Sequence, residues 1–231
     1  MRVAAIQSNY IPWKGYFDII NDVDLFIFHD DLQYTKQDWR NRNKIYTMHG
    51  ALSWLTVPCG INTDRMICEV ILNNNSKWAQ KHWNVIRQAY YKAPYYNKYK
   101  SFFEYVYLEC KWEYLSELNQ FLIKHIATEF LGIRTEFSDS RCFFSSGKKS
   151  EKLLSLLVSA GCNEYLSGPA ARAYLDEPAF QASGIRVVWK DYSGYPEYQQ
   201  MWQPFESNVS IIDLLMNVGE EAPYYIWGWR G

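Results

Sequence analysis

A dense group of charged, amide and aromatic side chains follows the second apolar run of the chain, where the sequence reads HDDLQYTKQDWRNRNK from position 29. Arginine offers a rigid fork of donors to phosphate or carboxylate groups, and asparagine adds neutral donors. The segment therefore predicts an anion site, although an exposed polar loop explains its composition equally well. The residues predicted to bind substrate here are Gln33, Tyr34, Lys36, Trp39, Arg40, Asn41, Arg42 and Asn43.

Three side chains are candidates for proton transfer. Asp30 and Asp31 are adjacent carboxylates that can raise one another's pKa or hold Mg²⁺. Because neighbouring residues on a strand point to opposite faces, we expect only one of them to face a site. His82 is a candidate acid or base on a predicted helix, with a structural histidine as the simpler alternative. The four histidines show no metal-ligand spacing, so the predicted site holds no metal.

Further polar stretches come directly after apolar runs. Ser167 and Gly168, at a strand-to-helix turn, offer a hydroxyl and free backbone N–H groups to an anion, and an ordinary turn is the alternative. Tyr198 lies in an aromatic and amide-rich loop, 191–205, that suits either a sugar platform or packing on the surface. The residues predicted to bind substrate after the run VAAIQ (3–7) are Gln7, Asn9, Tyr10 and Tyr16.

Apolar runs predict the elements that position these side chains. A strand at 3–7, a helix at 15–23 and a strand at 24–30 form a unit that is typical of a parallel sheet. Ligands of such sheets bind beyond the carboxyl ends of the strands. We therefore expect the Arg/Asn-rich turn and the later Ser-Gly corner to line one cavity at one edge of the sheet.

The remaining patterns extend this α/β alternation. Runs at 52–58 and 66–72 predict a β-hairpin. A helical layer or insertion is expected over 76–131, with its second helix opening at Ser101. Later patterns predict a helix at 148–160, strands at 164–168 and 185–192, and a helix at 210–219 with Ser210 as its N-cap.

At 231 residues the chain is long enough for one domain with a substantial core. We expect a single α/β domain over 1–231, with a mainly parallel central sheet, flanking helices, the hairpin and the helical layer. The formal net charge of −1 gives no global basic field, so nucleic acid is not an expected partner. No apolar stretch suits a membrane span or a signal peptide, so we expect a cytoplasmic protein.

The sequence lacks the motifs of several familiar chemistries. Five scattered cysteines without a CxxC pair predict neither a disulfide framework nor a zinc site. The GxSxG, P-loop and GxGxxG motifs are absent, so serine hydrolases, P-loop enzymes and dinucleotide-binding proteins have no positive support.

The chain resembles the WbqC-like protein family of bacterial gene clusters for O-antigen and other surface polysaccharides. The resemblance covers nearly the whole chain, and it departs from the family pattern at Ser8-Asn9, where Pro-Tyr is expected. The matching stretches are Gln7, the aromatic-Pro run ending at Pro12, Gly15-Tyr16-Phe17, VDLFIFHDDLQYTKQDWRNRNKI (23–45), WLTVP (54–58), YLSGPAARAYL (165–175) and SIIDLLMNVG (210–219).

The resemblance implies a cytosolic transferase that puts an amino acid such as glycine, or another acyl group, onto the amino sugar of a nucleotide sugar. Such an enzyme needs a basic site for diphosphate, a platform for the sugar or base, and a group that deprotonates the sugar ammonium. Segment 36–44 is expected to supply the first, the tyrosines the second, and Asp30, Asp31 or His82 the third. Besides the nucleotide sugar, the expected partners are an acyl carrier or a second copy of the chain.

Two other functions stay open. The start of the chain also looks distantly like the nucleotidylyltransferase and pantothenate synthetase superfamily, whose first loop holds ATP phosphates with two histidines around a glycine. Alignment on Gly15 puts Trp13 and Tyr16 in those positions, so an ATP-dependent ligase or nucleotidyltransferase would need other cations, namely Lys14, Lys36, Arg40 or Arg42. The co-substrate is therefore ATP or a pre-activated acyl donor. The absence of a recognised catalytic motif also leaves a non-catalytic nucleotide-sugar or glycan binding module open.

Overall fold

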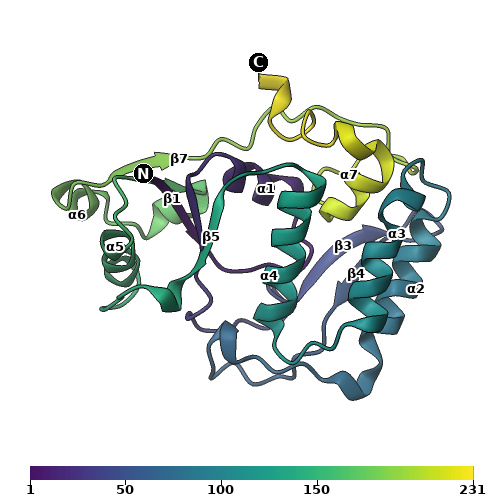
Figure 1. Cartoon of the computed structure of the whole chain (residues 1–231), viewed down its shortest axis with the longest axis horizontal. Helices are drawn as coiled ribbons and strands as arrows, with labels where there is room; N and C mark the ends of the chain where they lie inside the picture. The colour runs from purple at the N-terminus through teal and green to yellow at the C-terminus, as the bar shows by residue number, and fades with distance from the viewer. Residues whose placement is uncertain (231) are drawn as a thin grey trace.

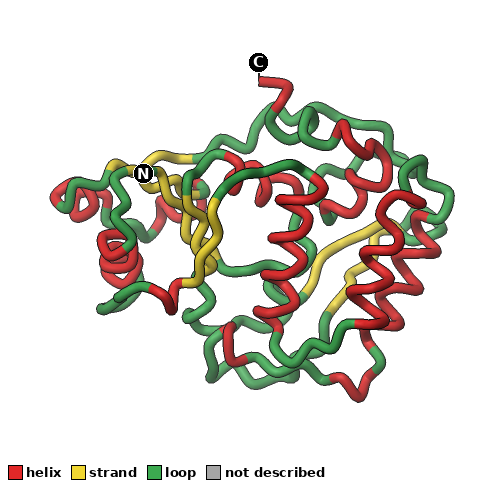
Figure 2. Tube along the Cα trace, viewed as in Figure 1, coloured by secondary structure: helices red, strands yellow, loops and turns green. Residues whose placement is uncertain are grey.

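The structure, a computed structural model, describes residues 1–230 and is built around a five-stranded sheet (Figures 1 and 2). Its strands lie in the order β5-β2-β1-β6-β7, and every neighbouring pair is parallel. The predicted fold class is therefore confirmed. The strands of this sheet are β1 (Arg2–Ile6), β2 (Leu25–Phe28), β5 (Glu136–Asp139), β6 (Glu164–Ser167) and β7 (Arg186–Trp189).

The strand order reverses at the centre of this sheet. From β1 the chain adds β2 and β5 on one side, and then crosses to the other side to add β6 and β7. Four residues of β1 pair with β2, whereas only Arg2 and Val3 pair with β6. The carboxyl ends of β1 and β6 therefore lie apart, at the switch point where ligands of such sheets bind.

Both faces of the central strands are buried. Because successive side chains point to opposite faces, each of these strands contributes side chains to two separate cores. Val3 and Ala5 pack in a smaller core, together with Leu153, Leu156 and Phe180. Ala4 belongs to the larger core, which runs on through the helices on the other side of the sheet. The helices beside the smaller core are α5 (Ser150–Ser159) and α6 (Glu177–Ala182), and the larger core includes α1 (Lys14–Asn21) and α7 (Ile211–Val218).

The closing helix follows its predicted signals. The Ser210 hydroxyl accepts a hydrogen bond from the backbone N–H of Ile212 at 3.3 Å, so Ser210 is the N-cap of α7. Gly219 ends the helix at φ +61°, where a side chain would be strained and where an added Cβ would lie 2.2 Å from the Tyr95 ring.

The β-hairpin is present, but its strands differ from the predicted ones. β4 (Leu52–Thr56) pairs antiparallel with β3 (Arg42–Tyr46), whereas the segment predicted as its partner, 66–72, forms a 3₁₀ turn and isolated bridges. The prediction of a 66–72 strand was wrong because Met66 and Ile71 are exposed and do not extend a buried face. The polar composition of β3 concealed a strand in which Asn43 and Ile45 are buried.

Helices occupy the segment between the hairpin and β5, and they gather on the side of the molecule opposite α5 and α6 (Figure 1). The second of them begins at Tyr96 rather than Ser101, because Tyr99 and Phe103 form one buried apolar face that starts before Ser101. The helices of this layer are α2 (Trp78–Tyr90), α3 (Tyr96–Glu104) and α4 (Leu115–His125), and α3 and α4 each continue into a π-helical turn. None of the helices within residues 1–230 is both long and apolar enough to cross a bilayer.

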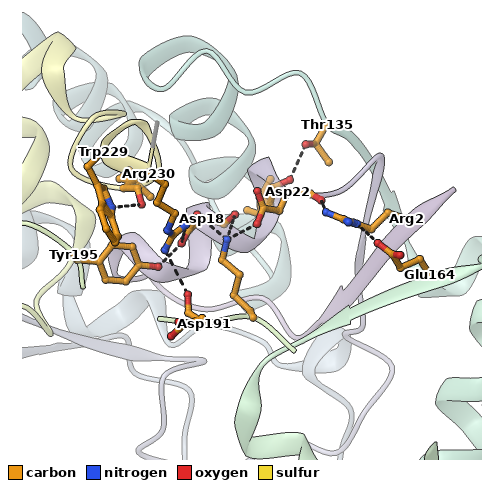
Figure 3. Close-up of polar contacts among 12 residues, drawn as sticks. Arg2, Asp18, Asp22, Thr135, Glu164, Asp191, Tyr195, Trp229 and Arg230 are labelled. Atoms are coloured by element: carbon orange, nitrogen blue, oxygen red, sulfur yellow. Dashed lines mark hydrogen bonds and ion pairs between the residues drawn. The ribbon is translucent and has the colours of Figure 1, made fainter. Parts of the chain in front are cut away.

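A buried carboxylate ties α1 to segments that come much later in the chain (Figure 3). Asp18 is fully buried, and its oxygens lie 2.8 Å from Lys190 Nζ and 2.9 Å from Arg230 Nη1. The Tyr195 hydroxyl also donates a hydrogen bond to this carboxylate. These contacts fix α1, which follows β1, against the chain that follows β7.

Substituting Asp18→Asn is expected to lower the free energy of unfolding by about 3 kcal/mol, because it leaves the buried Lys190 ammonium without its closest fully buried counter-charge. Urea denaturation measures the loss. The matched control is Arg186→Ala, which removes an exposed ion pair with Glu164 and should change stability by less than about 0.5 kcal/mol. A loss below about 1 kcal/mol for Asp18→Asn would contradict the assigned role.

A polar cluster lies inside the larger core. The Tyr10 hydroxyl lies 2.7 Å from His82 Nδ1 and 2.6 Å from the Tyr107 hydroxyl. Burial lowers the pKa of His82 to about 4, so this imidazole is neutral at neutral pH.

The buried His82 makes stability dependent on pH. Its pKa is lower in the folded protein than in the unfolded chain, so the unfolded chain takes up the proton first as the pH falls from about 6.5 to about 4. Stability should therefore fall over this range, by at most about 1.4 kcal/mol per pH unit from this residue. We expect His82→Asn to reduce the slope of unfolding free energy against pH, and the exposed-site control His49→Asn to keep it. Equal slopes in all three proteins would be inconsistent with a buried neutral His82.

Candidate functional site

A cavity of about 1440 Å³ lies at the switch point, beyond the carboxyl ends of β1, β2 and β6. Both stretches that the sequence predicts to share a cavity contribute to its walls. The lining residues include Gln7, Asn9, Trp13, Tyr16, His29, Asp31, Gln33, Arg40, Arg65, Lys148, Lys149, Lys152, Ser167, Gly168 and Tyr192. Its position is the one expected for a ligand of an open parallel sheet.

Asp30 is buried behind the side chains that line this cavity. Its carboxylate is fully buried, and it accepts hydrogen bonds from the Ser8 backbone N–H at 2.7 Å and from Gln120 Nε2 at 3.0 Å. Burial raises the pKa of Asp30 in spite of these donors. Asp30 is not among the lining residues. It acts as a positioning residue, because its hydrogen bond from the Ser8 N–H fixes the turn after β1.

Asp31 points to the other face and lines the cavity. Its carboxylate lies 2.6 Å from Lys152 Nζ and also accepts a hydrogen bond from the Ser140 hydroxyl. Burial raises the pKa of Asp31, but the hydrogen bonds from Lys152 and Ser140 outweigh this effect and leave the pKa below its ordinary value. Asp31 is therefore ionised at neutral pH, and it holds Lys152 in place.

His29 is a lining residue that the sequence did not suggest. It directly follows β2, and its backbone N–H donates to the Ile6 carbonyl at 3.0 Å. Its Nε2 is buried without a hydrogen-bond partner among residues 1–230, and it lies 3.6 Å from Asp31 Oδ1. Burial lowers the pKa of His29 to about 4, although the charge of Asp31 acts in the opposite direction. A neutral imidazole with a free nitrogen thus lines the cavity.

Five basic side chains line the cavity, against three acidic ones, Asp31, Asp64 and Glu69. Arg40 donates to Gln7 Oε1 at 2.5 Å and to Asp38 at 2.6 Å, and its Nε is buried without a partner among the described residues. The basic residues are Arg40, Arg65, Lys148, Lys149 and Lys152, of which the sequence predicted Arg40 alone. The overlooked signal is Gly-Lys-Lys directly before the amphipathic helix α5.

Aromatic side chains close another side of the cavity. The Trp13 indole lies against Gly15, where an added Cβ would be 2.3 Å from the ring, so glycine is needed for this approach. The ring meets Tyr192 edge-on, with centroids 5.4 Å apart. Tyr16 also lines the cavity, and its hydroxyl donates to the Gln7 carbonyl at 3.0 Å. The aromatic wall is therefore fixed by packing.

Several predicted site residues lie elsewhere, because folding uses their polar groups. Tyr10 and His82 form the buried cluster in the core. Tyr34 is buried with its ring beneath the Arg65 guanidinium, and Tyr198 donates to Asp213 at 2.7 Å inside the core. None of these four side chains lines the cavity.

Some residues of the Arg/Asn-rich segment also stabilise the fold, whereas others line the cavity. The Asn41 amide donates to the Val57 carbonyl at 2.9 Å, and the Arg42 guanidinium stacks over the Trp54 ring at 4.2 Å, so both stabilise the hairpin. Lys36 is exposed outside the cavity. Trp39 and Asn43 line a smaller chamber beside it. Of this segment, Asp31, Gln33 and Arg40 line the large cavity, together with Leu32.

No group of three His, Cys, Asp or Glu side chains within the described residues is arranged to hold a metal ion. The groups that could hold a phosphorylated ligand are the five basic side chains and the backbone at the Ser167–Gly168 corner.

Comparison with known proteins gives the family. The model of the WbqC-like protein family matches residues 7–225. The chain is also 45% identical over 227 residues to an uncharacterized protein, Rv1507c, of Mycobacterium tuberculosis (strain ATCC 25618 / H37Rv), with 97% of each chain covered. No solved structure matches the chain. With a match across nearly its whole length, the chain belongs to the WbqC-like protein family.

Proposed function

We propose that this protein is an amide-forming transferase that puts an acyl or aminoacyl group, such as glycyl, onto a nucleotide-linked amino sugar in surface-polysaccharide biosynthesis. The observation that carries the proposal is the switch-point cavity with five basic side chains. Membership of the WbqC-like family directs the choice of substrate, because the resemblance to this family implies a place in bacterial gene clusters for surface polysaccharides.

The charges of the cavity favour an anionic substrate. The basic lining residues outnumber the acidic ones, and Asp31 is already neutralised by Lys152 at 2.6 Å. Lys148 and Lys149 remain exposed at the start of α5, and Arg40, which is ion-paired with Asp38 at 2.6 Å, also lines the cavity. Walls of low dielectric constant strengthen such a field, so a diphosphate is the group that this cavity suits best.

Amide formation also needs an acceptor for the proton of the sugar amine. The amine nitrogen attacks the acyl carbon, the bond from that carbon to its activating group breaks, and the nitrogen loses a proton. His29 suits this step better than Asp30 or His82, because it lines the cavity and its buried Nε2 has no hydrogen-bond partner among the described residues. A bound diphosphate would raise the low pKa of His29 by stabilising the imidazolium, which brings this base closer to its working range.

Activation of the acyl group by ATP and use of a pre-activated donor both stay compatible with the cavity. Of the four cations considered for the phosphates of ATP, Lys14 is buried and Lys36 and Arg42 lie outside, which leaves Arg40. Lys148 and Lys149 are two further cations in the cavity, and the alignment with the nucleotidylyltransferase loop did not suggest them. A binding module without catalysis is the competing function, and product formation separates the two.

Binding of a nucleoside diphosphate tests the anion site. We expect UDP or dTDP to bind the wild-type protein and the affinity to fall at least about tenfold in Lys148→Ala/Lys149→Ala, because each lysine lost removes a charge-assisted contact. Titration calorimetry at low and high salt measures this. Arg42→Ala is the matched control, since its guanidinium stacks on Trp54 outside the cavity. Absence of binding by both nucleotides, or equal affinity in the lysine variant, would refute the site.

Product analysis tests the reaction. UDP- and dTDP-linked amino sugars, incubated with glycine and ATP or with acyl-CoA, should gain the mass of the acyl group. His29→Asn should lower the rate at least about a hundredfold, as loss of a general base does, while His49→Asn should not. A panel that binds nucleotide sugars but yields no product would favour the binding module.

The pH profile adds a check that is specific for His29. The ratio of kcat/KM between the wild type and His29→Asn should stay level from pH 7 down to about 5, because the pKa of His29 is about 4 and the ionisation of the sugar amine cancels in the ratio. The acid limb of kcat should lie at higher pH, since bound anion raises this pKa. Identical acid limbs for His29→Asn and wild type would remove His29 from the reaction.

A further inference from the structure

A second chamber of about 280 Å³ adjoins the large cavity and shares Asn9 and Trp13 with it. Its other lining residues are Pro12, Trp39, Asn43 and Asn208. Within residues 1–230, no charged side chain lines it, in contrast to the cavity next to it. The part of a ligand that enters this chamber is therefore uncharged.

The chamber is preformed, because its wall segments are hydrogen-bonded to one another. The Tyr10 N–H donates to the Trp39 carbonyl, and the Ile211 N–H donates to the Pro12 carbonyl, both at 2.9 Å. The Asn43 amide donates to the Tyr10 and Ile11 carbonyls at 3.2 and 2.9 Å. A ligand meets walls that need no ordering, which lowers the cost of binding.

Backbone strain marks the same wall. Ile11 has φ +37°, although a β-branched residue before proline strongly favours extended backbone. The hydrogen bonds from Asn43 hold this conformation, which carries the chain into Pro12 and Trp13. Strain of this kind persists where the surrounding structure fixes it, and it concentrates at ligand sites.

The lining chemistry suits a hydroxyl-bearing ring. Two indoles offer flat apolar faces, and Trp39 is 43% exposed. Asn9 and Asn208 line the chamber, and a side-chain amide offers both a donor and an acceptor. Hydroxyl groups need both. The volume of the chamber lies just below the range of drug-sized sites, which suits a single ring.

We infer that this chamber binds the sugar ring of a nucleotide sugar while its diphosphate lies among the basic groups of the large cavity, an inference that rests on the proposed function. Arg40 of the large cavity is the chain neighbour of Trp39, and Gln7, which accepts from Arg40, lies two residues before Asn9. The charged and uncharged groups thus adjoin, as they do in a sugar diphosphate. A nucleobase is separated from its phosphates by a ribose, which fits this adjacency less well.

The test compares nucleotide sugars with the bare nucleotides. Titration calorimetry with UDP-glucosamine, UDP-N-acetylglucosamine and dTDP-glucose should show that one or more of them binds at least about tenfold more tightly than UDP or dTDP. Trp39→Ala and Asn208→Ala should remove this difference and leave the affinity for UDP and dTDP unchanged. The control is Tyr91→Ala, which removes another exposed aromatic side chain that lies outside both sites. Circular dichroism checks that each variant is folded.

Three outcomes would overturn the inference. The first is that no nucleotide sugar in the panel binds more tightly than its bare nucleotide. The second is that both chamber variants keep the difference in affinity between nucleotide sugar and nucleotide. The third is that Trp39→Ala weakens the binding of UDP itself, which would put the base in the chamber.

If neither nucleotide binds, the proposed function fails separately. In that case methyl glycosides of glucosamine and N-acetylglucosamine, followed by saturation-transfer NMR, decide the chamber alone. Signal lost in Trp39→Ala supports it, and absence of signal in the wild type refutes it.

Discussion

The reversal of strand order between β1 and β6 is the constraint on which the functional part of this molecule depends. The two strands share only their first residues in the hydrogen-bonded register, and the crossovers leave their far ends in opposite directions. Polar side chains at the carboxyl ends of β1, β2 and β6 therefore meet there, and they line a cavity of about 1440 Å³.

The loops around this space are held by buried amides and carboxylates. Asp30 accepts from the Ser8 N–H, and Asn119 of α4 donates to the Arg40 carbonyl at 2.8 Å. Asn43 does the same for the carbonyls of Tyr10 and Ile11. A buried backbone polar group without a partner is costly, so each of these side chains fixes one loop conformation. Much of the polar residue content near the site is thus scaffold, which frees a smaller set for the ligand.

The sequence predicted the sheet well, because buried parallel strands consist of short apolar runs such as VAAIQ and DLFIF. It did not predict β3, since Asn43 is buried through its hydrogen bonds rather than through an apolar side chain. It also did not predict β5, a polar strand at the edge of the sheet. The location of the cavity followed from topology. The choice of lining residues did not, because composition cannot tell an arginine that stacks on a tryptophan, such as Arg42, from one that faces the cavity, such as Arg40.

The carboxylate of Asp18 meets a guanidinium that lies 212 positions later in the chain. While the protein is being synthesised, α1 therefore emerges long before the charges that neutralise it, and β1 likewise waits 162 positions for its partner at Glu164. Closing loops of this size is slow and brings the middle of the sheet together late. The edge of β1 that faces β6 thus stays unpaired until most of the chain has been synthesised, whereas its other edge can pair early with β2.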